Sequence, residues 1–219
     1  MILSKPHRNR LRRADKLYFQ SGKVRSHQVR TTEEFNAFFR ILIKLHQGRW
    51  QRRGLPGAFA SPNFQAFHRE IAAKLLADGR ATLTWFEMDG SPLAAEYRLH
   101  GENVMYAYQC GIDPDRLPIK PGELANMAAV KNAIERGQNA YDFLRGDEPY
   151  KARWRAQPQA MLSVRVIPRH TSARLRHGAW VAGQNVKQWI KSGLKTVGRW
   201  KAGSAASQES QDSASPGEA

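Results

Sequence analysis

The sequence predicts an α+β fold in which helices flank a mixed β-sheet, and the order of its periodic segments is the first observation behind this prediction. Apolar residues recur at helical spacing over residues 31–53 and 62–78, and the period changes to that of strands between Ala81 and Gly111. Another helical pattern begins at Pro121 and is followed by an apolar run from Tyr141 to Leu144. Elements in this order favour one α+β domain.

The second observation is the helix expected between Gly111 and Tyr141. A helix that connects two strands of one sheet makes them parallel, so the strands that carry Gln109 and Asp142 are predicted to be parallel neighbours. The three strands before that helix are joined by short turns, at Met88-Asp-Gly-Ser91 and Gly101-Glu-Asn103, and are predicted to be antiparallel. A parallel pair beside antiparallel strands can splay into a ligand cleft.

The remaining elements follow from local signals. Residues 4–20 predict a basic helix and residues 23–30 an edge strand. Thr31-Thr-Glu-Glu34 begins the first long helix, because a threonine oxygen caps free amide groups and the acids favour the positive end of the helix dipole. Ser61-Pro62 begins the second long helix, and residues 161–167 predict a last strand. The buried face of the second helix is predicted to hold Phe64, Phe67, Ile71, Leu75 and Leu76.

The excess positive charge lies at the two flanks of the chain. The formal net charge is +16, but residues 31–164 hold seventeen basic and fifteen acidic residues. Residues 1–30 hold nine basic residues against one acid, and residues 165–201 hold nine against none. The folded middle is therefore not expected to be a nucleic-acid platform, although the flanks could contact phosphates on RNA or on anionic lipid.

Cysteine content and hydropathy predict a cytoplasmic location. The single cysteine, Cys110, excludes an intrachain disulfide framework, and its position in an apolar strand favours a small core residue over a nucleophile. No signal-peptide pattern and no run of about 18 apolar residues occurs. The seven histidines show no metal-ligand spacing, and Asp113-Pro-Asp115 is typical of a polar turn, so no metal site is predicted.

The strongest candidate for a functional site is Tyr141-Asp-Phe-Leu-Arg-Gly-Asp-Glu-Pro-Tyr-Lys151, where an apolar run ends in a cluster of charges. Together with the order of elements, this motif resembles the GNAT-type acyltransferases, in their CelD/BioF-like branch, which is related to the FemAB aminoacyl transferases. Leu45-His-Gln-Gly-Arg-Trp50, Phe67-His-Arg-Glu70 and Pro121-Gly122 are similar to signature positions of that branch. The resemblance covers about residues 31–165.

The resemblance implies transfer of an acyl group, acetyl or another, from an acyl-coenzyme A to an amine acceptor. The donor would lie between the two splayed strands, with its pyrophosphate at the N-terminus of the following helix. The residues that would bind it are Gln109, Gly111, Lys120, Gly122 and Glu123. Most GNAT enzymes have a glycine-rich phosphate loop here, whereas this chain has only Ile119-Lys-Pro-Gly122.

The resemblance also implies catalytic and acceptor-binding residues. Asp142 or Asp147 would remove a proton from the amine, and Tyr150 would protonate the departing thiolate. The alternative reading for Asp142 and Arg145 is a simple ion pair that closes the strand end. The residues that would contact a small-molecule or glycan acceptor are His46, Arg49, Trp50, Arg145 and Lys151, of which the first three also fit an ordinary packing role.

Four segments are predicted, with boundaries at 1–30 (basic helix and edge strand), 31–168 (acyltransferase domain), 169–201 (basic amphipathic extension) and 202–219 (disordered tail). Lys187, Lys191, Lys195 and Arg199 share one helical stripe, which suits binding of residues 171–201 to an anionic membrane surface, although a solvated tail fits equally. Relatives of this branch usually carry two lobes, so the chain is expected to represent the C-terminal lobe.

Two other functions stay open at this stage. One is a non-catalytic binding domain that recognises an acidic partner through the basic flanks. The other is a tRNA-dependent, FemAB-like transfer, for which the same flanks would contact the RNA. Neither the acceptor nor the oligomeric state is encoded in a local motif.

Overall fold

The computed structural model describes residues 3–162 and 164–183. The chain divides into two compact units, Met1–Gln159 and Ala160–Ala219, and each is described by itself. The predicted functional boundaries at residues 30, 168 and 201 stay predictions.

The first unit follows the predicted order of elements. Its helices are α1 (Lys5–Ala14), the π-helical turn η1 (Asp15–Gln20), α2 (Thr32–Gln51), the 3-10 turn η2 (Ala58–Ala60), α3 (Pro62–Ala77), the 3-10 turn η3 (Leu117–Ile119), α4 (Pro121–Glu135) and α5 (Pro149–Arg153). Its strands are β1 (Val24–Gln28), β2 (Ala81–Met88), β3 (Ser91–His100), β4 (Val104–Ile112) and β5 (Ala140–Asp142).

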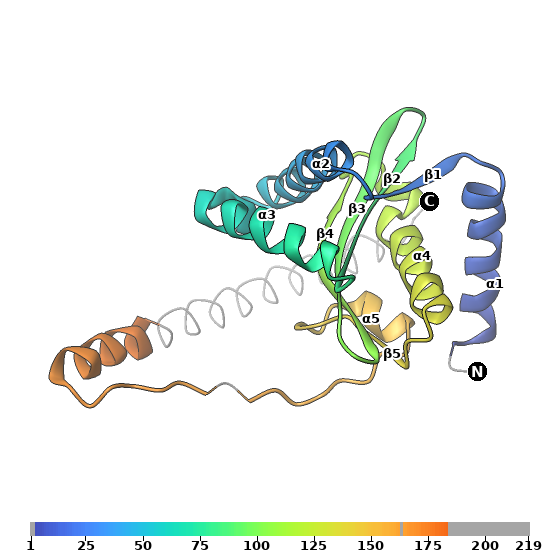
Figure 1. Ribbon diagram of the computed structural model, residues 1–219. Helices are drawn as coiled ribbons and strands as arrows, with labels where there is room; N and C mark the ends of the chain where they lie inside the picture. The colour runs from blue at the N-terminus through green and yellow to red at the C-terminus, as the bar shows by residue number, and fades with distance from the viewer. Residues whose placement is uncertain (1–2, 163, 184–219) are drawn as a thin grey trace, which may run out of the picture. The chain divides into compact units, whose positions relative to one another are not determined.

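The strands form one mixed five-stranded sheet in the order β1-β2-β3-β4-β5 (Figure 1). The pairs β1–β2, β2–β3 and β3–β4 are antiparallel. The pair β4–β5 is parallel because α4 connects the two strands. The edge strand predicted near residues 23–30 is confirmed as β1, and the tight turn after Met88 is confirmed. Asp89 and Gly90 both have positive φ there, as a two-residue hairpin turn requires.

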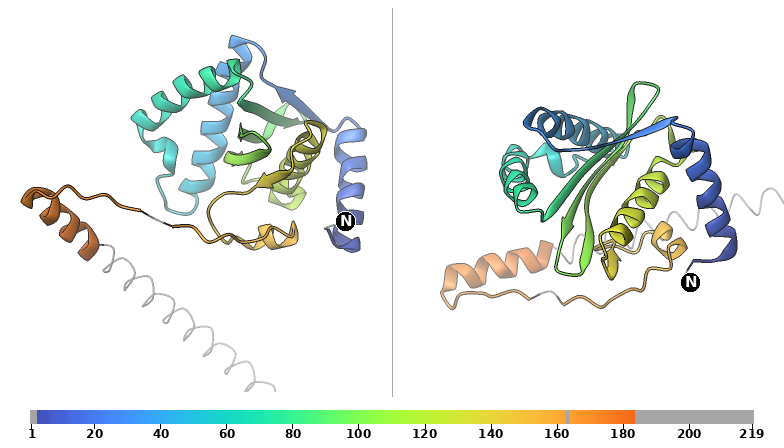
Figure 2. Two further views of the ribbon diagram at one scale, coloured as in Figure 1. Left: turned by 60° about the horizontal axis from the view of Figure 1, so that its bottom comes forward. Right: turned by 45° about the vertical axis from the view of Figure 1, so that its right-hand side comes forward.

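The helices cover both faces of the sheet, with α2 and α3 on one face and α1 and α4 on the other (Figures 1 and 2). The α2 and α3 side holds a core around Phe38, Leu42 and Tyr97. The other side holds a core around Phe86 and Leu124. This layered α+β arrangement, with flanking helices and a parallel strand pair, is the fold class that the sequence predicts.

Local sequence signals explain the start of α2. The Thr31 side chain accepts a hydrogen bond from the Glu34 amide, and the Glu34 carboxylate accepts one from the Thr31 amide. This reciprocal capping box satisfies amide groups that the first helical turn leaves free. The helix therefore begins where the sequence predicts.

Two predicted strands differ from the structure. The strand expected over Tyr141–Leu144 is Ala140–Asp142 instead, because Leu144 has φ of 56° and cannot continue an extended backbone. The strand expected over 161–167 is absent from the described residues of that range, where Leu162 and Val166 are 93% and 87% exposed. A strand needs a pairing partner, and this segment has none among the described residues.

In the second unit, residues 171–183 are helical. The guanidinium of Arg165 lies 3.3 Å from the centroid of the Trp180 ring. Lys187, Lys191, Lys195 and Arg199, on which the membrane prediction depends, and the predicted disordered tail lie outside the described residues. None of the helices that the structure describes combines the length and apolarity needed to cross a bilayer.

Candidate functional site

The parallel strands β4 and β5 pair over only three residues and then diverge. Val104, Met105 and Tyr106 pair with Ala140, Tyr141 and Asp142, whereas β4 continues to Ile112. The far half of β4 therefore has no partner on its β5 side among the described residues. Backbone amides and carbonyls on such an open edge can pair with an extended polar ligand.

A cavity of about 580 Å³ lies along this divergence. We call it the groove. It is lined by β4, the start of α4, the loop after β5 and the end of α2. Predicted site residues that line it are Gln109, Lys120, Gly122, Glu123, His46, Arg49, Trp50, Arg145, Tyr150 and Lys151.

Strand β4 contains a bulge next to the groove. Tyr97 and Arg98 of β3 pair with Gln109 and Ala107, so Tyr108 has no partner in the ladder. The Tyr108 hydroxyl lies 3.1 Å from Nε2 of His68 on α3. A bulge bends its strand and re-aims the neighbouring side chains, which here belong to the groove lining.

Gly111 does not line the groove, but it determines how closely α2, which forms one wall of the groove, packs against β4. A Cβ atom at Gly111 would lie 2.8 Å from Cβ of Leu45 and 2.9 Å from the amide nitrogen of His46. Only glycine allows α2 to approach β4 this closely. The predicted contribution of Gly111 to cofactor binding is thus accompanied by a packing role.

The N-terminus of α4 closes one end of the groove. Lys120 precedes the helix in the left-handed conformation, with φ of 57°, and Pro121 begins it. Glu123 lies in the first turn, and its carboxylate accepts a hydrogen bond from Nη2 of Arg10 at 2.8 Å. Arg10 therefore neutralises an acid at the helix end where an anionic ligand would otherwise be repelled.

Lys151 holds the loop that follows β5. Its Nζ donates to the carbonyl oxygens of Leu144, Arg145 and Gly146 at 2.9–3.1 Å. It also lies 2.9 Å from Oε2 of Glu148, and this contact lowers the pKa of the Glu148 carboxyl. The ammonium group is thus occupied within the loop, which gives Lys151 a positioning role at the groove.

Asp142 and Asp147 lie outside the groove lining. Both are exposed, and Oδ1 of Asp142 accepts a hydrogen bond from the Leu144 amide at 2.7 Å. This contact closes the turn after β5. The ion pair between Asp142 and Arg145 that the sequence left open does not form, since neither residue has a salt bridge in the described part of the chain.

His46 and Trp50 form one side of the groove. The Trp50 indole donates to Nε2 of His46 at 2.9 Å, and Nδ1 of His46 lies 3.1 Å from Oε1 of Gln47. Nδ1 therefore carries the proton and the ring is neutral. Burial lowers the pKa of His46, and the nearby charge of Arg49 lowers it further.

Tyr150 lines the groove at the start of α5. Its ring packs edge-on against Phe143, with 5.8 Å between the centroids. Burial, together with the charge of Glu148, raises the pKa of Tyr150 to about 12. The phenol is therefore protonated at neutral pH and can donate a proton or a hydrogen bond.

The sequence interpretation missed several residues of the groove lining. They are Glu96 and Arg98 on β3, Tyr141 on β5, Asn126 on α4, and Glu148 and Arg153 around α5. Glu148 belongs to the charged motif from Tyr141 to Lys151, and Arg153 follows that motif two residues later, so the sequence signal lay next to both. Glu96 and Arg98 alternate with apolar residues of a strand, which is also the pattern of a solvated sheet face.

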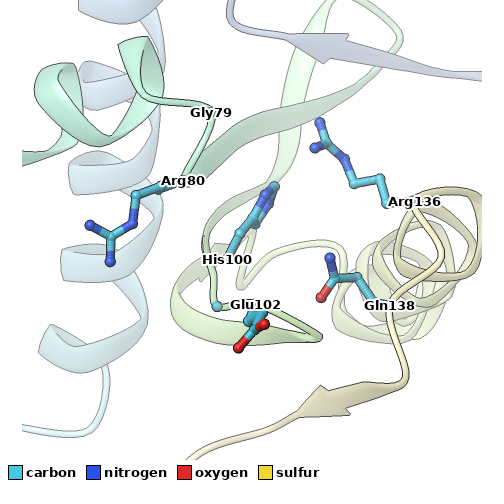
Figure 3. A pocket seen from close by; sticks show the side chains of 7 residues that line it. Gly79, Arg80, His100, Glu102, Arg136 and Gln138 are labelled. Carbon is cyan, nitrogen blue, oxygen red and sulfur yellow. The ribbon is translucent and has the colours of Figure 1, made fainter.

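A second cavity, of about 470 Å³, lies near the end of β3 and the end of α4 (Figure 3). His100 is at its centre, but the ring is already engaged by Oγ1 of Thr82 at 2.9 Å and by the Gly79 backbone. Arg80 points away from His100 and Gln138 in Figure 3. The groove, in contrast, combines cations that have no salt bridge among the described residues, one buried acid and an open strand edge, and is the better candidate site.

Comparison with known proteins identifies the family of the chain. The family model for the acetyltransferase (GNAT) domain matches residues 5–152, so the chain belongs to the GNAT acetyltransferase family and is an N-acetyltransferase by family. The match includes α1, the groove lining up to Lys151 and α5 as far as Ala152. No curated protein matches the chain significantly.

Solved structures that are similar to the chain are distant from it in sequence. A GCN5-related N-acetyltransferase from Ralstonia eutropha JMP134 is 20% identical, with a TM-score of 0.49, and the alignment covers 65% of this chain and 98% of that one. An acetyltransferase from Clostridium acetobutylicum, solved with acetyl-CoA, is 12% identical, with a TM-score of 0.47 and coverage of 65% and 96%. FemX is 14% identical, with a TM-score of 0.51 and coverage of 67% and 49%.

Proposed function

We propose that the protein transfers an acyl group, acetyl or another, from an acyl-coenzyme A to the amine of a small-molecule or glycan acceptor. The observation that carries this proposal is the groove itself. Strands β4 and β5 separate after three paired residues, and a cavity of about 580 Å³ follows the open edge of β4. An extended donor with amide groups suits an open strand edge, because each amide finds a backbone partner there.

The charges around the groove fit a donor that carries phosphates. Lys120, Arg49, Arg145 and Arg153 line it and have no salt bridge among the described residues. Each acid of the lining has a cation close by, since Arg10 pairs with Glu123, Lys151 with Glu148, and Arg98 lies beside Glu96. The free charges that remain are positive, which favours binding of a pyrophosphate.

The transfer needs a neutral amine and a proton for the departing thiolate. We assign the proton donor to Tyr150, whose phenol lines the groove in its protonated form. Asp142 and Asp147 stay candidates for the base and are tested by Asp142→Asn and Asp147→Asn. His46, Trp50, Arg49 and Arg145 are proposed to contact the acceptor, and Lys151 to hold the loop that carries Arg145.

Calorimetric titration of the full chain with acetyl-CoA tests the proposed function. We expect saturable binding that Lys120→Ala weakens and Lys131→Ala leaves unchanged, because Lys131 lies on the same helix but pairs with Asp15 away from the groove. Release of free thiol is then followed with a panel of primary amines. Tyr150→Phe should retain donor binding and lower turnover. Absence of any saturable binding of acetyl-CoA would overturn the proposal.

We further propose membership of the CelD/BioF-like branch, supported by the charged motif from Tyr141 to Lys151. A cytoplasmic location, where acyl-coenzyme A is available, and a peripheral contact of residues 171–201 with anionic membranes complete the proposal. Flotation with anionic vesicles, with and without residues 171–201, tests the membrane contact. Equal recovery of the two forms contradicts it.

Transfer from aminoacyl-tRNA, or RNA binding without catalysis, is the second candidate function. Helix α1 favours it, because Lys5, Arg12, Arg13 and the following Lys16 are exposed basic side chains on one short segment. Such a surface suits a phosphate backbone. A ribonuclease-sensitive activity, or salt-sensitive RNA binding without acetyl-CoA binding, would support this candidate against the first.

A further inference from the structure

Two charged side chains are buried at the floor of the groove. Glu96 and Arg98 are two residues apart on β3, so their side chains lie on the same face of the sheet. Their residues are only 4% and 3% exposed. Glu96 pairs in register with Cys110 of β4 and Thr84 of β2, so it lies one strand away from the open edge.

The Glu96 carboxylate has an unsatisfied oxygen. Within residues 3–162 and 164–183 its Oε2 has no hydrogen-bond partner, and Nε of Arg98 lies 3.7 Å away, beyond hydrogen-bond distance. Arg98 instead donates from Nη2 to Oγ1 of Thr84 at 2.8 Å. The Tyr141 hydroxyl, which also lines the groove, has no partner in that part of the chain either. Buried polar atoms of this kind are rare in folded proteins and call for a ligand or a function.

The fold could do without these charges. The same face of the sheet is apolar further along, where Phe86 and Ala94 pack against Leu124 of α4. Replacement of a buried ion pair by apolar residues is often neutral or stabilising. A buried carboxylate that lines a cavity and has an oxygen without a hydrogen bond is typical of a functional site.

We propose that Glu96 is the proton acceptor of the reaction. This inference rests on the proposed function and adds a catalytic residue to it. Glu96 takes a proton from the acceptor ammonium, directly or through one water, and the neutral nitrogen forms its bond to the thioester carbonyl carbon. The carbon–sulfur bond breaks and the thiolate takes a proton from Tyr150. The nitrogen loses its surplus proton to solvent, Tyr150 takes a proton back from solvent, and Glu96 returns its proton to solvent.

Position distinguishes Glu96 from the aspartates that the sequence suggested. Glu96 and Tyr150 line the same cavity, whereas Asp142 and Asp147 do not. Asp142 is also occupied by the Leu144 amide. A base must reach the reacting nitrogen, so a carboxylate that lines the groove is better placed than an exposed one that does not.

The surroundings of Glu96 affect its own pKa and those of the neighbouring titratable groups. Burial raises the pKa of Glu96, which strengthens it as a base, while Arg98 on the same strand opposes the shift. The other titratable groups nearby are Cys110, Tyr141 and Tyr150, and the charge of Glu96 helps to raise the pKa of each. Environments that separate the pKa values of neighbouring groups are how acid and base roles are assigned in one site.

The first test compares Glu96→Gln with Glu87→Gln, a matched change on the adjacent strand outside the groove. Thiol release from acetyl-CoA is measured with spermidine and glucosamine as amine probes, across pH 5–9. We expect Glu96→Gln to lower turnover by about 10²-fold or more, to lose the acidic limb of the pH profile, and to keep the wild-type affinity for acetyl-CoA. Wild-type turnover and an unchanged profile would overturn the inference.

The second readout does not depend on activity. Because the folded protein favours the protonated carboxyl, burial of ionised Glu96 costs stability once the pH rises through its folded pKa. Glu96→Gln should therefore melt at a higher temperature than the wild type near pH 8, and this advantage should shrink as the pH falls from the folded pKa of Glu96 towards 4.5. A lower melting temperature at pH 8 would instead mean a structural ion pair with Arg98 and contradict the inference.

A third variant, Glu96→Asp, tests the same role if Glu96→Gln does not fold. Glu96→Asp keeps the charge but withdraws the carboxylate by one methylene, so turnover should fall while the acidic limb of the pH profile persists. Wild-type turnover of this variant overturns the role of Glu96. The proposed function itself fails separately, if the wild-type chain neither binds acetyl-CoA nor releases thiol from it.

Discussion

Gly111 of β4 lies directly against the backbone of His46 of α2. A Cβ atom at Gly111 would be 2.9 Å from the His46 nitrogen and 3.0 Å from the Leu42 carbonyl oxygen. Backbone atoms cannot turn away as a side chain can, so the helix itself would have to move. Because the end of α2 also carries Arg49 and Trp50, the spacing between helix and strand fixes one wall of the groove.

Gly111→Ala should therefore destabilise the fold and disturb the groove together. Overpacking of this kind costs about 1–3 kcal/mol of unfolding free energy. We expect a lower urea midpoint and weaker acetyl-CoA binding. Gly122→Ala is the matched control for stability, because a Cβ there meets only Cγ2 of Ile112, at 3.8 Å. If both variants unfold at the wild-type midpoint, the close approach of α2 to β4 is not important for stability.

Lys151 provides the second prediction. Lys151→Met keeps a similar volume but removes the donor from three loop carbonyls and the partner of Glu148. Since these carbonyls can be rehydrated, the expected loss is about 1–2 kcal/mol. Hydrogen exchange should accelerate at residues 143–148, next to the groove.

Lys74→Met is the control for this change. Its ammonium pairs with Glu70 on the exposed face of α3, a contact worth at most about 0.5 kcal/mol. Unchanged exchange at residues 143–148 in Lys151→Met would show that the loop holds its conformation without the ammonium, and that Lys151 acts in another way.

Helix α1 contributes to the third prediction through Arg10. Arg10→Ala leaves the Glu123 carboxylate uncompensated at the N-terminus of α4, where the donor pyrophosphate is proposed to lie. A contact of this type is worth about 0.3–1 kcal/mol, so the dissociation constant of coenzyme A should rise about two- to fivefold at low salt. The effect should shrink at high salt.

Lys131→Ala separates this effect from loss of helix docking. Lys131 pairs with Asp15 at 2.6 Å and ties η1 to α4, as Arg10 ties α1 to α4, but further from the groove. It should leave the affinity for coenzyme A unchanged. Equal weakening by the two variants would mean that docking, not the charge at Glu123, determines affinity.

The sequence predicts the elements better than it predicts the site. Helix α2 begins at the predicted residue because the capping box of Thr31 and Glu34 is local chemistry. Phe67 shows the limit of periodicity, since it was expected in the buried face of α3 and is 59% exposed, whereas His68 is buried. Adjacent residues on a helix differ by about 100° in direction, so a small rotation of the packed face exchanges them.

Glu96 and Arg98 show why part of the groove could not be predicted. Their spacing of two residues along β3 shows that both side chains lie on the same face of the sheet. The spacing does not show whether a helix covers that face. The cover comes from α4, more than twenty residues later in the chain. Asp142 and Asp147 show the converse: the charged motif contains them, yet both are exposed and neither lines the groove.

Neutral histidines lead to the last prediction, the pH dependence of stability. Burial lowers the pKa of His46, so the unfolded chain takes up a proton at a higher pH than the folded protein does. The stabilising effect is fully present above about pH 6.5 and is lost as the pH falls through the folded pKa. Protonation also places a donor on Nε2, where the Trp50 indole already donates.

Urea unfolding at pH 7.5 and pH 5.0 measures this loss, which for one histidine is at most about 1.4 kcal/mol per pH unit. The pKa values of His7, His68 and His100 are also lowered by burial, so the wild type should lose stability through several groups at once. His46→Gln should narrow the difference between the two pH values, and His170→Gln, on an exposed residue, should not. If His46→Gln leaves the difference unchanged, His46 takes up its proton at the same pH in the folded and unfolded states, and burial and the Trp50 hydrogen bond do not hold its ring neutral.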